Sequence, residues 1–237
     1  MALLLIILLF LALIYFFYES SRTASQNKLW TAMAKETAHQ IGTPLSSLIG
    51  WTELLKNENI KARYIEEMNN DIKRLKTITD RFSKIGSVPQ LLPTDIIKAT
   101  KTAIDYLRSR SSALIKFEIE LPTTPCSVSL NVELYSWTIE NLVKNGIDAM
   151  KGKGLLKIVV YSNEQFVFID ISDSGKGLSK AQFKSIFETG YTTKKRGWGL
   201  GLSLAKRIVE QYHKGKIKVL SSEIGKGTTI QISLKKL

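Results

Sequence analysis

The stretch Asn141-Leu142-Val143-Lys144-Asn145-Gly146-Ile147-Asp148-Ala149 decides the fold of the C-terminal half of the sequence. It lies within residues 131–150, whose apolar periodicity predicts a helix. Asn141 and Asn145 are four residues apart, so both amides lie on one face of that helix. Taken alone, this pair fits a polar binding site and an ordinary solvated helix surface equally well, and its meaning depends on the segments around it.

Those neighbouring segments alternate apolar and polar residues with the period of β-strands. We predict strands at residues 116–121, 155–161, 165–172, 216–220 and 228–234, a turn at 163–164 and a further helix at 202–212. Strands interleaved with helices in this order indicate the α+β class, an α/β sandwich in which a mixed sheet carries its helices on one face.

Three glycine-rich segments punctuate the same half of the chain. They are Asp173-Ser174-Gly175-Lys176-Gly177, Gly197-Trp198-Gly199-Leu200-Gly201-Leu202 and Gly225-Lys226-Gly227-Thr228. Glycine lets the backbone approach a ligand closely. The second segment leads into a predicted helix, whose N-terminus offers unpaired N–H groups and a positive dipole end to an anion. Each motif alone is common, and only their order and spacing are specific.

The N-terminal half has the pattern of a helical hairpin. Apolar positions recur at steps of three and four at Ala38, Ile41, Leu45, Leu48, Thr52 and Leu55, and again at Met68, Ile72, Leu75, Thr79 and Phe82. A polar break at 57–59 separates the two runs. Two helices bury little surface by themselves, so we expect two chains to associate as a four-helix bundle.

His39 falls on the flank of this seam rather than within it. An imidazole on a rigid helix can accept a phosphoryl group as a neutral nucleophile near pH 7, although a lone surface histidine usually has no such role. Thr43-Pro44 follows it, and a proline inside a helix costs about 3 kcal/mol, which favours a functional bend beside His39. His213, before Lys214-Gly215, is predicted to be a helix C-cap residue.

Residues 2–18 are apolar and uncharged, and as a helix they span roughly 25 Å. This length is just enough to cross a bilayer, with Tyr15 and Tyr18 at the interface and Arg22 and Lys28 on the cytoplasmic side. A signal peptide would need a basic segment before the apolar run, and a buried core helix would show a polar face. We therefore predict a membrane span, either a minimal anchor or the end of a longer sensory region.

The formal net charge is +13. The basic residues are scattered rather than gathered into a block or interleaved with aromatics, so we do not expect nucleic-acid binding, although the charge also suits a face near anionic lipid. Cys126 is the single cysteine, and it is expected to be buried, inert and reduced.

Together these motifs resemble those of the sensor histidine kinases of two-component systems. His39-Gln40-Ile41-Gly42-Thr43-Pro44-Leu45 is similar to the phosphoacceptor box and residues 141–149 to the N box. The first two glycine-rich segments resemble the two glycine boxes, residues 225–228 the last one, and Phe187 with residues 191–194 the F-box region. The resemblance covers residues 28–237 in the family's order.

The resemblance implies a Bergerat-type (GHKL) site for ATP and Mg²⁺, with residues 188–198 as a lid. Asp173 would accept a hydrogen bond from the adenine amino group, and Asn145 would coordinate Mg²⁺. The lid would bring hydroxyls and cations to the phosphates. The implied nucleotide-binding residues are Asn141, Asn145, Asp173, Gly175, Gly177, Thr192, Thr193, Lys194, Arg196, Gly197, Gly199, Leu200 and Gly201.

The apolar run predicts a transmembrane helix at 1–20, and the resemblance implies a dimerisation and phosphotransfer hairpin at 21–88 and an ATP-binding domain at 89–237. His39 would be phosphorylated and would pass the phosphoryl group to an aspartate of a response regulator. Thr43 would support the reverse reaction by positioning water for the dephosphorylation of that response regulator. The implied location is the inner (cytoplasmic) membrane, which this chain would cross once, with its catalytic domains in the cytoplasm. The hairpin would form a homodimer.

Three positions depart from the family pattern. Gln40 replaces an acidic residue beside the phosphoacceptor, and an amide can orient the imidazole but cannot act as a general base. Glu36, one turn earlier, is a possible substitute. Gly146 stands where alanine is usual, and Asp148 stands where some relatives carry a phosphate-facing lysine.

Two other functions remain open from the sequence. A GHKL-type ATPase would use a carboxylate such as Glu140 as its base and would not need His39. A catalytically weak signalling scaffold would bind nucleotide or a partner without forming phosphohistidine. Phosphate labelling separates the three, because only the kinase gives an acid-labile, alkali-stable label on His39.

Overall fold

The computed structural model describes residues 1–56, 62–85, 89–192 and 199–237. The chain forms two compact units, Met1–Pro89 and Gln90–Leu237. Each has its own internal packing and is described by itself.

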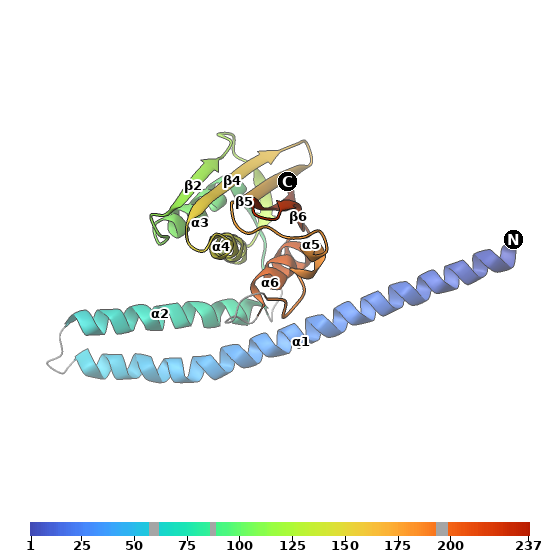
Figure 1. The fold of residues 1–237 in the computed structure, drawn as a ribbon. Coiled ribbons are helices and arrows are strands. Elements are labelled where there is room, and N and C mark those ends of the chain that lie inside the picture. Colours follow the sequence, from blue (N-terminus) through green and yellow to red (C-terminus); the bar gives the residue numbers. More distant parts are fainter. Residues whose placement is uncertain (57–61, 86–88, 193–198) are drawn as a thin grey trace. The chain divides into compact units, whose positions relative to one another are not determined.

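The first unit is a pair of helices, α1 (Ala2–Lys56) and α2 (Ala62–Ile85), which lie side by side (Figure 1). The predicted apolar segment and the first helix of the predicted hairpin are thus one continuous helix. Leu45 and Thr52 of α1 and Ile72 of α2 are buried, and all three are seam positions in the sequence. The polar break at 57–59 lies outside the described residues.

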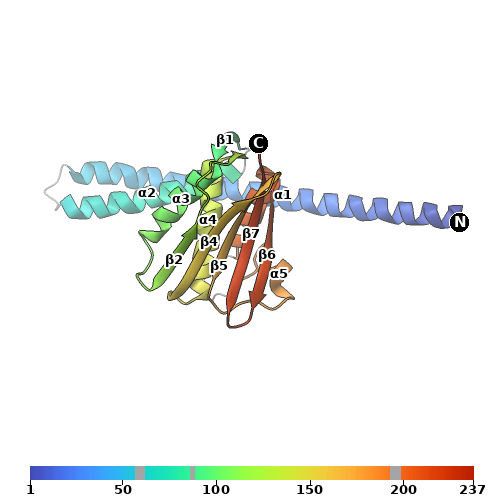
Figure 2. The same cartoon turned by 90° about the horizontal axis from the view of Figure 1, so that it is seen from above.

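The second unit is built on a five-stranded sheet with the order β2-β4-β5-β7-β6 (Figure 2). Its strands are β2 (Ile115–Glu120), β4 (Gly154–Ser162), β5 (Phe166–Asp173), β6 (Lys216–Glu223) and β7 (Gly227–Lys235). The β2–β4 pair is parallel and the other pairs are antiparallel, so the sheet is mixed, as predicted. A small second sheet pairs β1 (Leu92–Asp95) with β3 (Ser127–Leu130).

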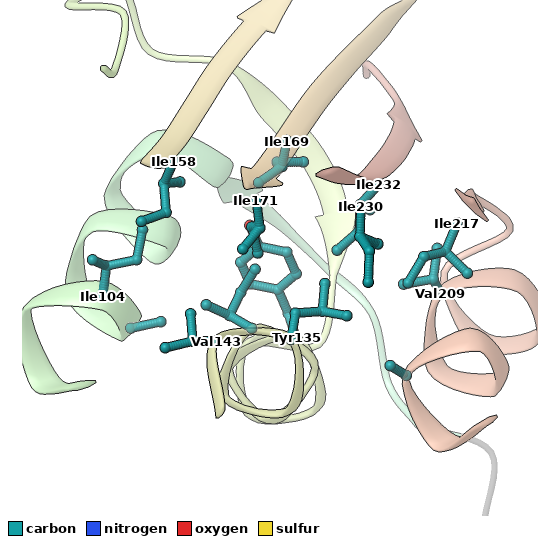
Figure 3. Close-up of a cluster of buried hydrophobic side chains, with 14 of the residues drawn as sticks. Ile104, Tyr135, Val143, Ile158, Ile169, Ile171, Val209, Ile217, Ile230 and Ile232 are labelled. Atoms are coloured by element: carbon teal, nitrogen blue, oxygen red, sulfur yellow. The ribbon is translucent and has the colours of Figure 1, made fainter. Parts of the chain in front are cut away.

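Helices cover one face of the large sheet. They are α3 (Ile96–Arg108), α4 (Val132–Ala149) and α6 (Gly201–Arg207), which continues as the π-helix η1 (Ile208–Tyr212); the short α5 (Gln182–Ser185) lies before the lid segment. Alternate residues of the strands point toward these helices, and Figure 3 shows Ile158, Ile169 and Ile171 above α3 and α4. The α+β sandwich expected from the sequence is confirmed.

The N-terminus of α4 is fixed by two polar side chains. Asn131 is its N-cap, and its Oδ1 accepts a hydrogen bond from the Leu134 N–H at 3.1 Å. Nε2 of His213 accepts the Asn131 N–H at 3.0 Å, and Nδ1 of His213 lies 2.9 Å from the Ile208 carbonyl oxygen. His213 ends η1, as predicted, but it is also buried and joins η1 to the start of α4.

The burial of His213 predicts a pH-dependent stability. Burial lowers its pKa from 6.5, because the site favours the neutral imidazole. The unfolded chain takes up a proton near pH 6.5 while the folded chain does not, so this stabilisation is present above pH 6.5 and is lost as pH falls. The unfolding temperature is expected to drop by about 3 °C between pH 7.5 and 5.5 because of this residue.

Thermal unfolding of His213→Gln should lack this part of the pH dependence, because the glutamine oxygen accepts the same N–H without titrating. A His39→Ala variant, which removes the other histidine of the chain, should keep it. Equal pH dependence in His213→Gln and the wild type would show that the pKa of His213 is the same in the folded and the unfolded chain.

Candidate functional site

Asn141 and Asn145 occupy one face of α4, as the spacing predicts. Nδ2 of Asn145 donates to the Asn141 carbonyl oxygen at 2.7 Å, which orients the Asn145 amide. Nδ2 of Asn141 is buried and has no hydrogen-bond partner within the described residues. A buried amide donor without an acceptor costs about 1–3 kcal/mol, so such a group is typical of a place where a ligand supplies the acceptor.

The start of α6 lies against this pair of amides. A Cβ atom on Gly201 would lie 3.4 Å from Oδ1 of Asn141 and 3.7 Å from Nδ2 of Asn145. Leu200 precedes the helix without a side-chain cap, so the first N–H groups of α6 have no capping oxygen from it. The two amides and the positive end of α6 thus meet at one place, an arrangement that suits a phosphate group.

Asp173 ends β5 and packs against α4. A Cβ atom on Gly146 would lie 3.1 Å from Cβ of Asp173 and 2.9 Å from Cδ1 of Leu156, so the helix reaches the strand here because residue 146 has no side chain. This explains the glycine that departs from the usual alanine. The turn of α4 that follows Asn145 therefore packs directly against Asp173.

The carboxylate of Asp173 is half-buried. Burial raises its pKa from 3.8, and hydrogen bonds from the backbone N–H groups of Gly175 and Thr228 act in the opposite direction. The Gly175 bond measures 2.8 Å. These bonds fix the carboxylate at the end of the sheet, where it can accept a hydrogen bond from a ligand amino group.

The turn after Asp173 needs its glycines. Gly177 has φ +69°, and a Cβ atom there would lie 2.0 Å from the Glu223 carbonyl oxygen. At Gly175 a Cβ atom would lie 2.6 Å from the backbone of Ala149. The turn therefore fits between the end of α4 and the end of β6, which no larger residue would allow.

The two ends of the predicted lid lie next to each other. The Gly190 N–H donates to the Gly199 carbonyl oxygen at 3.1 Å, which joins the two ends of the segment. Next to this closure, Nε2 of Gln182 donates to the Tyr191 hydroxyl at 2.8 Å, a contact that the sequence analysis did not anticipate. Thr192 is exposed.

Five other residues singled out in the lid lie outside the described residues: Thr193, Lys194, Arg196, Gly197 and Trp198. Their role at the phosphates stays a prediction.

Glu140, the carboxylate that an ATPase would use, forms an ion pair with Lys144. Its Oε1 lies 2.6 Å from Nζ of Lys144, one turn along α4. The carboxylate is thus engaged by a lysine of its own helix, and the Glu140 side chain is only 16% exposed.

His39, Gln40 and Thr43 lie on α1. Their side chains are outside the described part of the structure, so the roles expected of them stay predictions. The first unit does, however, keep several large apolar side chains exposed, both at the predicted seam positions Leu48, Met68 and Leu75 and at Ile49, Trp51 and Leu54.

Two family models match the chain. Residues 29–88 match the His Kinase A (phospho-acceptor) domain, and residues 133–237 match the histidine kinase-, DNA gyrase B-, and HSP90-like ATPase domain. The second match contains Asn141, Asn145, Asp173 and Gly201, and the first contains His39.

Curated relatives include Sporulation kinase C of Bacillus subtilis, which is 26% identical over 221 residues, covering 90% of this chain and 51% of the relative. Sensor histidine kinase ZraS of Escherichia coli is 29% identical over 216 residues, covering 85% of this chain and 44% of the relative. The chain thus spans about half the length of these relatives.

Solved structures share the fold. Full-length ShkA in complex with AMPPNP has a TM-score of 0.65 at 19% identity, covering 86% of this chain and 45% of ShkA. Histidine kinase ThkA in complex with response regulator protein TrrA has a TM-score of 0.56 at 22% identity, covering 86% and 61%.

Proposed function

We propose that this chain, which belongs to the two-component sensor histidine kinases, transfers the γ-phosphoryl group of ATP to its own His39 and then to an aspartate of a response regulator. The observation that carries the proposal is the meeting of Asn141, Asn145 and Gly201 in a chain that also holds a phosphoacceptor hairpin. An ATP site and its acceptor are then parts of one molecule.

In this proposal the chain's residues bind and orient the nucleotide. Asp173 accepts a hydrogen bond from the adenine amino group, and the unpartnered Nδ2 of Asn141 donates to a phosphate oxygen. Asn145 would hold Mg²⁺ through its amide oxygen, together with the phosphates, and the cation supplies charge neutralisation there when bound. The start of α6 would offset the remaining phosphate charge, and the same role is expected of the lid cations Lys194 and Arg196.

The transfer itself takes place at an imidazole nitrogen of His39. Its lone pair forms a bond to the γ-phosphorus as the bond to the oxygen of the departing ADP breaks, and the ring loses its N–H proton to solvent or to a neighbouring base. Gln40 can orient the ring but cannot take that proton. In the second step the phosphoryl group moves to a carboxylate of the receiver domain, and Thr43 positions water for the later dephosphorylation of that partner.

The exposed apolar side chains of α1 and α2 support a homodimer. Trp51 is 57% exposed and Leu54 60% exposed in the single chain, and a second hairpin would bury such residues in a four-helix bundle. The solved complex of histidine kinase ThkA with response regulator protein TrrA is an example of a kinase of this fold that binds a response regulator.

The N-terminal part of α1 supports membrane attachment. Leu3–Ser21 is long and apolar enough to cross a membrane, with a mean hydropathy of 2.4 and none of it buried. We propose that it spans the inner membrane and that Arg22 and Lys28 mark the cytoplasmic side, where both catalytic parts would work.

Incubation with γ-³²P-ATP and Mg²⁺ tests the proposal. The purified chain should acquire a label that is stable to alkali and lost in acid, and a receiver domain added later should remove it. Release of inorganic phosphate without any labelled protein would instead favour the ATPase, and nucleotide binding with neither outcome would favour the scaffold.

A further inference from the structure

The face of the large sheet opposite the helices carries a group of exposed aromatic residues. Val167, Ile169 and Ile171 of β5 point into the core. Phe166 and Phe168, which alternate with them along the strand, therefore point the other way. Tyr161 of β4 is paired in register with Phe168, and their rings stack at 5.2 Å between centroids.

This aromatic group is held in place. The rings of Phe166 and Phe168 lie 6.4 Å apart. Nε2 of Gln231 lies 2.9 Å from both the Tyr161 hydroxyl and Oδ1 of Asp170. Tyr161 nevertheless remains 41% exposed and Phe166 38% exposed. Aromatic rings that are held in place by their neighbours yet exposed to water are typical of a surface that contacts an apolar partner, such as a protein or a membrane.

Lysines flank the aromatic group on one side. Lys235 of β7 is paired in register with Phe166, Lys216 of β6 lies one strand beyond Phe168, and Lys218 lies one strand beyond Asp170. All three are exposed. Along β6 the first acidic residue is Glu223, at its far end.

One acidic residue of this face, Asp170, lies beside the rings and accepts a hydrogen bond from Gln231. Glu118 and Glu120 are on β2 at the other edge of the sheet. Glu120 forms an ion pair with Lys157 at 2.6 Å. Three lysines against the carboxylate of Asp170 give the β6–β7 side of the rings a net positive charge.

We propose that this basic aromatic face, made of Tyr161, Phe166, Phe168, Lys216, Lys218 and Lys235, docks on the anionic surface of the lipid bilayer. Lysine ammonium groups complement anionic headgroups, and tyrosine and phenylalanine rings enter the boundary between headgroups and acyl chains. The net charge of +13 likewise favours an anionic bilayer over a protein surface without negative charge.

The length of α1 places the bilayer within reach, an argument that rests on the proposed membrane span and phosphoacceptor. Ser21, at the end of the apolar segment, and His39 are 18 residues apart on one continuous helix, a distance of about 27 Å. The 148 residues of the second unit form a body about 38 Å across. A body of this width that works at His39 can touch the headgroups, and its tether makes even a weak contact effective.

Lysine footprinting of the full chain tests the proposal. The chain is reconstituted in nanodiscs of phosphatidylcholine alone or with about one third phosphatidylglycerol, and acylation of each lysine by an amine-reactive reagent is followed by mass spectrometry. In the anionic discs the rates at Lys216, Lys218 and Lys235 should fall about threefold, while Lys101, exposed on α3 behind the sheet, should not change. The protection should vanish at about 1 M salt, where screening shortens to about 3 Å.

A matched pair of charge reversals sharpens the test. Lys216→Glu with Lys218→Glu should abolish the protection of Lys235, and Lys98→Glu with Lys101→Glu on α3 should leave it intact. Both double variants should label normally with γ-³²P-ATP in detergent, because none of these lysines lies at the nucleotide site.

Two results would overturn the docking proposal. One is equal acylation of the three lysines in neutral and anionic discs. The other is protection in neutral discs that grows with protein concentration, which would mean that a second copy of the chain covers the face. A failure of the proposed kinase function would appear separately, as a wild-type chain that is not labelled in detergent.

Discussion

Replacement of His39 by alanine is expected to abolish phosphate labelling of the chain. The variant lacks the only nitrogen nucleophile in the phosphoacceptor box, and loss of the attacking group lowers the yield of phosphoprotein at least about 100-fold. The measurement is the initial rate of acid-labile ³²P incorporation from γ-³²P-ATP, with wild type and variant at equal nucleotide saturation.

Nucleotide binding serves as the control for this variant. The structure places Asn141, Asn145 and Asp173 in the second unit, which has its own core. His39→Ala should therefore bind a fluorescent ATP analogue within about twofold of the wild type, since a residue in a separate unit contributes little to ground-state binding. Label that survives in His39→Ala would show that another residue is the acceptor.

The sequence predicts the nucleotide half of the fold well where local signals are strong. The helix at 131–150 appears as α4, with Asn131 as its cap. The five predicted strands appear within one or two residues at most ends, because β2, β4 and β5 and the first half of β6 alternate more and less buried residues.

The parts that the sequence analysis missed depend on distant partners. The four residues of β1 include Pro93 and form a strand only by pairing with β3. The helix α3 is an exception, because it has a local signal: its buried residues follow a helical period after the N-cap Asp95. The π-helical end of α6 has no local signature.

At the site, the sequence predicts which residue types are present, and the structure shows which contacts require them. The spacing of Asn141 and Asn145 predicts a shared face, but nothing in the sequence reveals that Gly146 lets α4 reach Asp173. Likewise, the joining of Gly190 to Gly199 depends on two backbone groups nine residues apart. Such contacts are set by how the helix and the sheet pack, which local patterns do not encode.

Replacement of Asp173 by asparagine is expected to weaken ATP binding about 10- to 100-fold. The carboxylate accepts a charge-assisted hydrogen bond from the adenine amino group, worth about 1.5–3 kcal/mol, whereas the asparagine side chain is uncharged and can turn its own NH₂ toward that amino group. Titration calorimetry with ATP measures the change. Asp170→Asn, the same substitution on the same strand but on the opposite face, should bind ATP like the wild type.

The same variant is expected to be more stable than the wild type when no nucleotide is bound. Because burial raises the pKa of Asp173 above 3.8, the folded chain holds its proton to a higher pH than the unfolded chain. The carboxylate therefore lowers the free energy of unfolding increasingly as pH rises from 3.8 through the folded pKa, and the cost persists at neutral pH. Asparagine keeps an oxygen that can accept the Gly175 N–H and removes the charge.

Thermal unfolding without nucleotide at pH 7.5 should thus show Asp173→Asn melting above the wild type, and the gap should close as the pH falls below 3.8, where the carboxyl group of the wild type becomes protonated in both states. A lower melting temperature of the variant at pH 7.5 would mean that the ionised carboxylate stabilises the fold. Weaker binding together with a more stable fold is the combination expected of a group kept for a ligand, because a residue kept for folding alone would lose stability when replaced.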